Sequence, residues 1–518
     1  MKLISEPAIA IKISKMKHRV RWKHRSVIQM GIDQTRMVLD DGKQDQGQFS
    51  FMVIGDTGTR STYTQHPQRL IAESMLKHRD DCAFTLHTGD VIYVVGSSEY
   101  YPQNFIEPYR EFLFGGENPR SIRYDRMLFE KPILPVLGNH DYYDVPWIYR
   151  LVAGSTKSLR KLFKYKDSEI GWHGSNQGDA FARAFIDYLA QIPEAELAHH
   201  FDSFYNAKTD TGRVLRYLPG FFTRIPNRYY TFSYGGIDFF ALDSNTFNVP
   251  TPIPHTREGD ATRHQLEKRR QQIEQEEVEI ITAIAKLDRE NPEHTEQLEA
   301  LTGKLNQIDE IKIDIEKQLQ EPGNLVYDTE QLEWLTNRLI ASWQNPEIRG
   351  RVLYFHHPPF VTEATKWHQA QTLAVRHRLR EVFDNVERVI GKDRNQRPIV
   401  DLILNGHAHC LEYLTTADTG HADTGINCLV CGGSGHRPRR QREDNNQLME
   451  VVDGKQRKVA DSHLFVGCNG YNSKRRLPYS FVRIDVQDGT PPRFIVRPYV
   501  WERYQKQWFS YELDPFEF

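Results

Sequence analysis

Side chains that bind metal ions recur directly after apolar runs in this 518-residue chain. The candidates are Asp56, Asp90, Tyr93, Asn139, His140, His356, His357, His407 and His409. Carboxylate, imidazole and amide oxygen suit iron, manganese and zinc, and no thiolate stands among them to favour softer ions. A carboxylate such as Asp90 can bridge two cations about 3.5–4 Å apart, and two metal ions can activate water and neutralise a phosphoryl group. The residue types therefore indicate a two-metal site suited to phosphoryl transfer.

Each of these side chains stands at the end of a predicted strand. The strands are expected within residues 48–58, 82–90, 132–141, 352–360 and 399–409. Segments with helical spacing, such as residues 66–78 and 372–386, alternate with them, which favours parallel βαβ units. In open α/β sheets, ligand sites form outside the carboxyl ends of the strands. We therefore expect all five ends to face one crevice.

The histidines of "NGHAH" illustrate the geometry. Residues i and i+2 of a strand share a face, so His407 and His409 can point at the same pair of ions while the small Ala408 turns away.

The remaining segments are predicted to surround this centre. Residues 1–47 are basic and alternate weakly, which indicates extra strands or a mobile arm. Residues 147–220 are partly helical and could cap the site, and short strands near the C-terminus indicate a second sheet. Apolar residues at three-, four- and seven-residue spacing within 262–320 predict an antiparallel, coiled-coil-like helical hairpin. We therefore expect a catalytic domain of residues 48–255 and 323–518, interrupted by a hairpin insertion of residues 256–322.

Composition excludes several classes of protein. The chain has 67 basic and 69 acidic residues and a net charge of −2, so nucleic-acid binding is not expected. No run of about 18 apolar residues predicts a membrane span, and the N-terminus lacks the apolar core of a signal peptide. Five scattered cysteines argue against a disulfide framework. These features predict a cytoplasmic protein.

The apolar seam of the predicted hairpin is buried in one of two ways. Either its two helices pack only against each other, or the hairpin also binds a second copy of the chain or another protein partner.

Several other residues invite functional and structural interpretations. His87 is expected in the core, and Cys410, Cys428 and Cys431 are expected as small buried side chains rather than zinc ligands. The arginine-rich residues 435–443 either line the site and bind a phosphorylated substrate or form a solvated loop.

The strand-end motifs "GDTG", "GDVIY", "GNHD", "FHHPP" and "GHAH" resemble the five blocks of calcineurin-like metallophosphoesterases. The tyrosine of "GDVIY" and the glycine of "GDTG" make the chain most similar to purple acid phosphatases. The resemblance covers residues 48–255 and 325–485 and implies a two-sheet α-β-β-α sandwich. Two departures are that His356 follows Val352 by four positions, and that only 47 residues precede the first block, too few for the N-terminal sandwich domain of plant-type members.

The resemblance also implies a role for each candidate residue. Asp56, Tyr93 and His409 would hold Fe(III), Asp90 would bridge, and Asn139, His356 and His407 would hold a divalent Fe, Zn or Mn ion. His140 would bind phosphate or protonate the leaving group, with His357 beside it. The implied reaction is hydrolysis of small phosphomonoesters by a metal-bound hydroxide. Alternatives are a phosphodiesterase acting on cyclic nucleotides, nucleic acid or lipid headgroups, or a scaffold protein that uses the hairpin.

Overall fold

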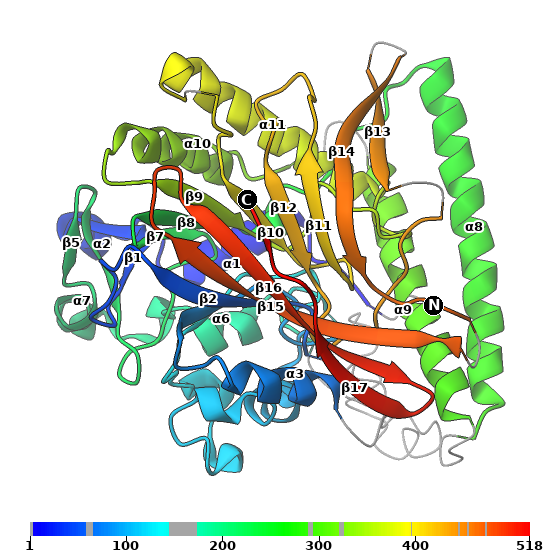
Figure 1. The fold of residues 1–518 in the computed structure, drawn as a ribbon, viewed down its shortest axis with the longest axis horizontal. Coiled ribbons are helices and arrows are strands. Elements are labelled where there is room, and N and C mark those ends of the chain that lie inside the picture. The colour runs from blue at the N-terminus through cyan, green and yellow to red at the C-terminus, as the bar shows by residue number, and fades with distance from the viewer. Residues whose placement is uncertain are drawn as a thin grey trace.

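Two stacked β-sheets form the centre of the molecule, with helices outside them (Figure 1). The computed structural model describes residues 4–58, 66–144, 174–288, 294–320, 326–394, 396–443, 446–452, 455–471 and 474–518. The larger sheet has 11 strands. In spatial order they are β13 (Gln447–Val452), β14 (Lys455–Val466), β11 (Leu411–Thr416), β12 (Asn427–Cys431), β10 (Leu402–Asn405), β9 (Gly350–Tyr354), β8 (Ile237–Ala241), β7 (Tyr230–Tyr234), β1 (Ile32–Leu39), β6 (Gly212–Tyr217) and β5 (Ala207–Thr209).

The smaller sheet has seven strands and supplies the first three metal-ligand motifs. Its order is β17 (Gln507–Glu512), β16 (Arg493–Tyr504), β15 (Arg476–Gln487), β2 (Phe49–Ile54), β3 (Cys82–His87) and β4 (Ile133–Pro135), and β18 (Phe516–Glu517) pairs with β16. Strands β2, β3 and β4 are parallel neighbours, so their carboxyl ends lie at one edge.

The helices and shorter turns complete the molecule. The α-helices are α1 (Ile9–Arg19), α2 (Arg25–Gln29), α3 (Pro67–Leu76), α6 (Asp179–Phe185), α7 (Leu197–Phe204), α8 (Arg257–Ala285), α9 (Thr295–Gln318), α10 (Thr329–Gln344) and α11 (Ala370–Ile390). Short 3-10 helices span Ser98–Tyr100, Arg110–Phe112, Pro119–Ser121, Tyr124–Arg126, Leu189–Gln191, Glu194–Glu196, Ser244–Thr246 and Gly391–Arg394, and one π turn spans Pro102–Ile106. Among these helices, none combines the length and apolar character that a membrane crossing requires.

Alternating side chains build a core on each face of the larger sheet. Phe239 on β8 contacts Phe51 and Phe84 of the smaller sheet, with ring centroids 5.5 and 5.3 Å apart. Its neighbour Phe240 points the other way, into the apolar layer beneath α10 and α11. Helix α3 packs against β15 and β16 of the smaller sheet. Because side chains alternate between the faces of a strand, this layering requires apolar residues at successive positions, and the predicted two-sheet α/β sandwich is confirmed.

The N-terminal segment forms two helices as well as strand β1, where the sequence predicted extra strands or a mobile arm. Residues 9–19 form helix α1, whose buried face carries Lys12, Met16 and Arg19. The weak alternation of "AIAIKIS" was misleading because this buried face depends on charges whose partners, such as Asp179 for Arg19, lie far away in the sequence. Strand β1 lies inside the larger sheet, between β7 and β6 and parallel to both.

The predicted cap region is only partly described. Residues 145–173 lie outside the described residues. The rest includes α6, α7, β5 and β6, and β6 extends the larger sheet by pairing with β1. The division of the chain into domains stays a prediction.

Helices α8 and α9 occupy the segment read as a hairpin and lie side by side at one edge of the molecule (Figure 1). Ile273 and Ile280 of α8 form an apolar cluster with Ile308 and Ile315 of α9. A buried ion pair joins Glu277 to Lys312 at 3.0 Å within the same interface.

Candidate metal centre

The predicted ligands converge where the two sheets meet. Asp56, Asp90 and Asn139 follow β2, β3 and β4 of the smaller sheet. His356 follows β9 of the larger sheet, while His407 and His409 follow its parallel neighbour β10. All six side chains are buried. The carboxyl ends of strands from two sheets therefore meet at one site. The sequence predicted that these five strand ends would face a single crevice.

Unusual backbone geometry brings these residues close together. Asp56, Asp90 and His407 have φ angles of 54°, 54° and 65°, in the left-handed region that residues other than glycine rarely adopt. Such conformations cost about 1–3 kcal/mol each and persist where the surrounding structure enforces them, often at functional sites.

Close packing around the carboxylates explains two of the glycines in the motifs. A Cβ atom at position 138 would lie 2.1 Å from Asp90 Oδ1, and one at position 406 would lie 2.5 Å from Asp56 Oδ2. Both distances are far below van der Waals contact, so only glycine fits beside these two carboxylates.

One half of the centre contains Asp56, Tyr93 and His409. The Tyr93 hydroxyl donates a hydrogen bond to Asp56 Oδ1 at 2.8 Å and lies 3.2 Å from His409 Nε2. His409 Nε2 lies 3.6 Å from Asp56 Oδ1. The three side chains predicted to hold the first metal ion thus meet through one atom each.

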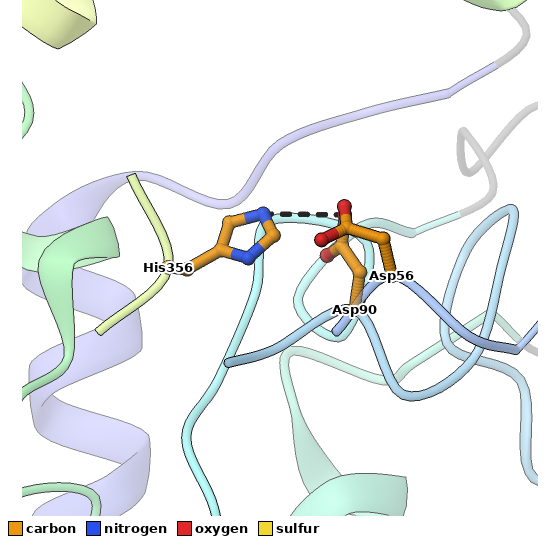
Figure 2. A group of neighbouring side chains, drawn as sticks. All are labelled: Asp56, Asp90 and His356. Atoms are coloured by element: carbon orange, nitrogen blue, oxygen red, sulfur yellow. Dashed lines mark ion pairs between the residues drawn. The ribbon is translucent and has the colours of Figure 1, made fainter. Parts of the chain in front are cut away.

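The other half contains Asn139, His356 and His407. Asn139 Oδ1 lies 2.9 Å from His356 Nε2 and 2.9 Å from His407 Nδ1. Asp90 Oδ2 lies 3.2 Å from His356 Nε2, the ion pair drawn in Figure 2, where the Asp56 and Asp90 side chains gather opposite the imidazole. Ligand atoms of Asp56, Asp90 and His356 all lie within 4.8 Å of one another. Asp90 therefore occupies the place between the two halves that a bridging ligand requires.

The electrostatics of the site reflect buried carboxylates packed together. Burial, with the nearby charge of Asp90, raises the pKa of Asp56 to about 7. Burial also acts to raise the pKa of Asp90, but the positive charges of His356 and His140 outweigh it and lower that pKa. Burial lowers the pKa values of His407 and His409 well below the ordinary value, which keeps both imidazoles neutral, the form that binds metals.

This donor set fits a pair of metal ions. The buried carboxylates of Asp56 and Asp90 stand beside His407 and His409, which burial keeps neutral, and a metal ion would add compensating charge to that of His356. Burial and the two carboxylates hold the pKa of Tyr93 well above its ordinary value, so only a strongly charged metal ion would convert it to a tyrosinate ligand. The assignment of the individual ligands stays a prediction.

The two histidines predicted to act in catalysis are placed differently. His140 donates from Nδ1 to the Val94 carbonyl at 2.6 Å, and its backbone N–H donates to Asp90 Oδ1 at 2.8 Å. His357 lies beside the ligands, but its Nδ1 is 2.8 Å from Ser244 Oγ and its Nε2 is 3.2 Å from Asn248 Nδ2. The imidazole of His357 is therefore held by its own neighbours, and its catalytic role stays a prediction.

Sequence reasoning gave no role to Asp141. Its carboxylate accepts backbone N–H groups from Gly138, Val91 and Ile92, at distances of 2.9 to 3.3 Å. It thereby fixes the loops that carry Asp90 and Asn139 relative to each other. Its place in the "GNHD" motif was the available signal.

Sequence reasoning also missed a charged cluster at the edge of the centre. Glu310 of α9 forms hydrogen-bonded ion pairs with Lys366 and Arg439, and its Oε1 lies 3.8 Å from His140 Nε2. Arg439 belongs to residues 435–443, so that loop contributes at least one side chain to the site. Nothing in the hairpin pattern marked Glu310, because the pattern described only the seam between α8 and α9.

The structural interpretations of other residues are confirmed. His87 is fully buried, and its Nε2 lies 2.9 Å from Thr57 Oγ1. Cys428 and Cys431 are buried on β12 in the apolar layers on opposite sides of the sheet, so they cannot bind one zinc ion together. Cys410 is buried in the same layer as Cys428.

A separate surface cleft of about 890 Å³ lies at the wrong end of the sheet for this chemistry. It is lined by Ser50, Cys82 and Pro132, at the starts of β2, β3 and β4, whereas ligand sites form at the carboxyl ends. The candidate centre is therefore the buried cluster of ligands.

Comparison with known proteins supports the resemblance over part of the chain. A stretch of 107 residues is 32% identical to Purple acid phosphatase 3 of Arabidopsis thaliana, covering 21% of this chain and 26% of the relative. The chain thus matches about a quarter of that relative, and the resemblance to purple acid phosphatases predicted from the motifs is confirmed there. No family model matches the chain.

Two solved structures are similar at low identity. One is purple acid phosphatase PPD1 from yellow lupin (Lupinus luteus), with a TM-score of 0.40 and 12% identity, over 92% of this chain and 54% of that one. The other is GAP50, the anchor in the inner membrane complex of Plasmodium, with a TM-score of 0.36 and 10% identity, over 90% of this chain and 89% of that one.

Proposed function

We propose that this chain is a two-metal phosphatase that hydrolyses small phosphomonoesters. The observation that supports it most is the convergence of Asp56, Asp90, Asn139, His356, His407 and His409 from the ends of five strands. The part-length similarity to Purple acid phosphatase 3 supports the same activity. Asp56, Tyr93 and His409 would hold Fe(III), and Asn139, His356 and His407 would hold divalent Fe, Zn or Mn, with Asp90 between them.

The metal ions, when bound, supply an activated water molecule and positive charge for the phosphoryl oxygens. The chain's own groups orient the reaction. The Val94 carbonyl accepts a hydrogen bond from His140 Nδ1–H, which leaves Nε2 as the nitrogen that can hold a proton for the leaving oxygen. Ser244 and Asn248 fix the imidazole of His357, which packs 4.5 Å from the His407 ring, measured between centroids, and keeps that ligand in place.

The activity is tested by reconstituting the purified chain with Fe, Mn or Zn and measuring hydrolysis of a chromogenic phosphomonoester and a matched phosphodiester. We expect the monoester to be the faster substrate. A faster diester would replace this proposal with a phosphodiesterase, and an inactive protein under every metal condition would leave the scaffold interpretation. The predicted cytoplasmic location stays a prediction.

Tyr93 provides an independent test through colour. A tyrosinate bound to Fe(III) absorbs visible light, so the iron-loaded protein should be purple or pink and Tyr93→Phe should be colourless. Tyr205 is a matched control, because it is equally buried, packs against Phe201, and donates its hydroxyl to Asp187 at 2.9 Å rather than to a predicted ligand. Colour that persists in Tyr93→Phe, or that Tyr205→Phe abolishes, would contradict the assignment of Tyr93 as a ligand.

A further inference from the structure

Helix α9 has a second buried face, which packs against the rest of the molecule rather than against α8. Glu310, Ile313, Asp314 and Lys317 follow i, i+3, i+4 and i+7 spacing and are all buried. Ile313 forms an apolar cluster with Ile4, Val95 and Tyr143.

Asp314 and Lys317, which follow Ile313 on this face, form hydrogen bonds with segments next to the candidate centre. The Asp314 carboxylate accepts the backbone N–H groups of Ala370 and Gln371 at 3.2 and 3.1 Å, at the start of α11. Lys317 donates to Asn248 Oδ1 at 3.1 Å, and Asn248 in turn contacts His357. Helix α9 is thus docked on the candidate centre by specific polar contacts.

At the end of this face, Glu310 lies among positive groups of the centre. Its carboxylate is bound by Lys366 Nζ and lies 3.3 Å from two nitrogens of Arg439. The His140 Nε2 atom lies 3.8 Å away. Lys366 is fully buried, and the side chains of Glu310 and Arg439 are only 5% and 12% exposed.

This arrangement has the chemistry of an anion site. Lys and Arg side chains bind carboxylate and phosphate oxygens through the same charge-assisted hydrogen bonds. Without Glu310, the buried Lys366 and Arg439 would lack the carboxylate that both now bind, beside a histidine at the edge of the centre. The carboxylate therefore stands where an oxyanion of similar size would find two cations and one imidazole.

We propose that Lys366, Arg439 and His140 form an anion subsite for a phosphate group, and that Glu310 of α9 occupies this subsite as an internal substitute. An incoming phosphate group must displace the Glu310 carboxylate, because that carboxylate now binds both buried cations. The subsite rests on the proposed phosphatase function only for the identity of the anion. Through Glu310, helix α9 then controls which ligands can bind at the centre.

The test is titration calorimetry of the full-length protein with inorganic phosphate. Removing the competing charge in Glu310→Gln should tighten phosphate binding by about tenfold or more, because charge-assisted hydrogen bonds to Lys366 and Arg439 become available to the ligand. Glu267→Gln is the matched control, since it removes the same charge from an exposed position on α8, and its affinity should equal that of the wild type.

Two further variants separate this subsite from phosphate binding at the metal ions alone. Adding Lys366→Met to Glu310→Gln should cancel the gain in affinity. Glu310→Asp keeps the charge on a shorter side chain and should bind phosphate with an affinity between those of the wild type and Glu310→Gln. If Glu310→Gln fails to fold, the wild type and Glu310→Asp still provide the comparison.

The outcomes distinguish this inference from the proposed function. Unchanged phosphate affinity in both Glu310 variants would overturn the subsite even if the protein hydrolyses phosphomonoesters. A gain that requires Lys366 would support the subsite even if the protein proves inactive as a phosphatase.

Discussion

Substituting Gly406 by alanine should disable the centre without removing any ligand. The new Cβ would lie 2.5 Å from Asp56 Oδ2, 2.8 Å from Thr88 Oγ1 and 3.0 Å from the Thr88 carbonyl oxygen. The backbone oxygen cannot easily retreat, so the Asp56 carboxylate must shift by about 1 Å. Asp56 Oδ2 also accepts a hydrogen bond from the backbone N–H of His407 at 2.9 Å, so a shift of the carboxylate disturbs a second ligand.

The expected losses of activity and stability follow from the displacement of the Asp56 carboxylate. A misplacement of about 1 Å at a catalytic centre lowers rates by about 100-fold. Overpacking a filled interior costs about 1–3 kcal/mol of the free energy of unfolding. We therefore expect Gly406→Ala to remain folded, with a lowered melting temperature, reduced metal content and about 1% of wild-type phosphomonoesterase activity.

Three measurements on each protein check this: metal content by elemental analysis, initial rates on a chromogenic phosphomonoester, and thermal unfolding by circular dichroism. Gly303→Ala is the matched control, because a Cβ there meets only Arg437 Cδ, at 3.8 Å. Alanine in the interior of α9 should stabilise the protein by about 0.5–1 kcal/mol and leave metal and activity unchanged. Wild-type metal content and activity in Gly406→Ala would refute the placement of Asp56 in the centre.

Two predictions concern the attachment of the α8–α9 segment. Although burial raises the pKa of Glu6, the charges of Lys12 and Lys317 lower it from 4.5 to about 2. This contribution, about 3 kcal/mol, is present above pH 4.5 and is lost as the pH falls toward 2. Denaturant unfolding between pH 5 and pH 3 should therefore show a steeper loss of stability in the wild type than in Glu6→Gln, and equal slopes would contradict the pairing. Lys312→Met should cost about 3–5 kcal/mol in the same assay because it leaves Glu277 buried without this cation, and Lys312→Met with Glu277→Leu should recover most of the loss; no recovery would show that the pair is not the cause.

The metal-ligand candidates could be predicted because their signals are local. Each stands two to six residues beyond an apolar strand, and parallel strands bring their carboxyl ends to one edge whatever else the chain does. His407 and His409 illustrate this, since the same "NGHAH" loop delivers one imidazole to Asn139 and the other to Asp56 and Tyr93.

Glu310 and α1 could not be predicted because their environments are created by distant residues. The apolar spacing of residues 298–319 identifies the seam toward α8, but it contains no information on what the opposite face of α9 meets. Similarly, Lys12 and Arg19 make residues 9–19 look like a polar surface segment, whereas Glu6 and Asp179 allow both charges to be buried. Buried ion pairs between distant segments are invisible to periodicity.

The central claim is that these side chains form one two-metal centre, and counting metal ions tests it most directly. The wild-type chain should hold two metal ions per chain by elemental analysis after reconstitution with iron and zinc and removal of free metal. Asp90→Asn should lose most of both, because Asp90 lies between the two halves and would contact both ions. A wild-type protein that retains no metal under these conditions, or an Asp90→Asn protein that retains two ions, would contradict the account.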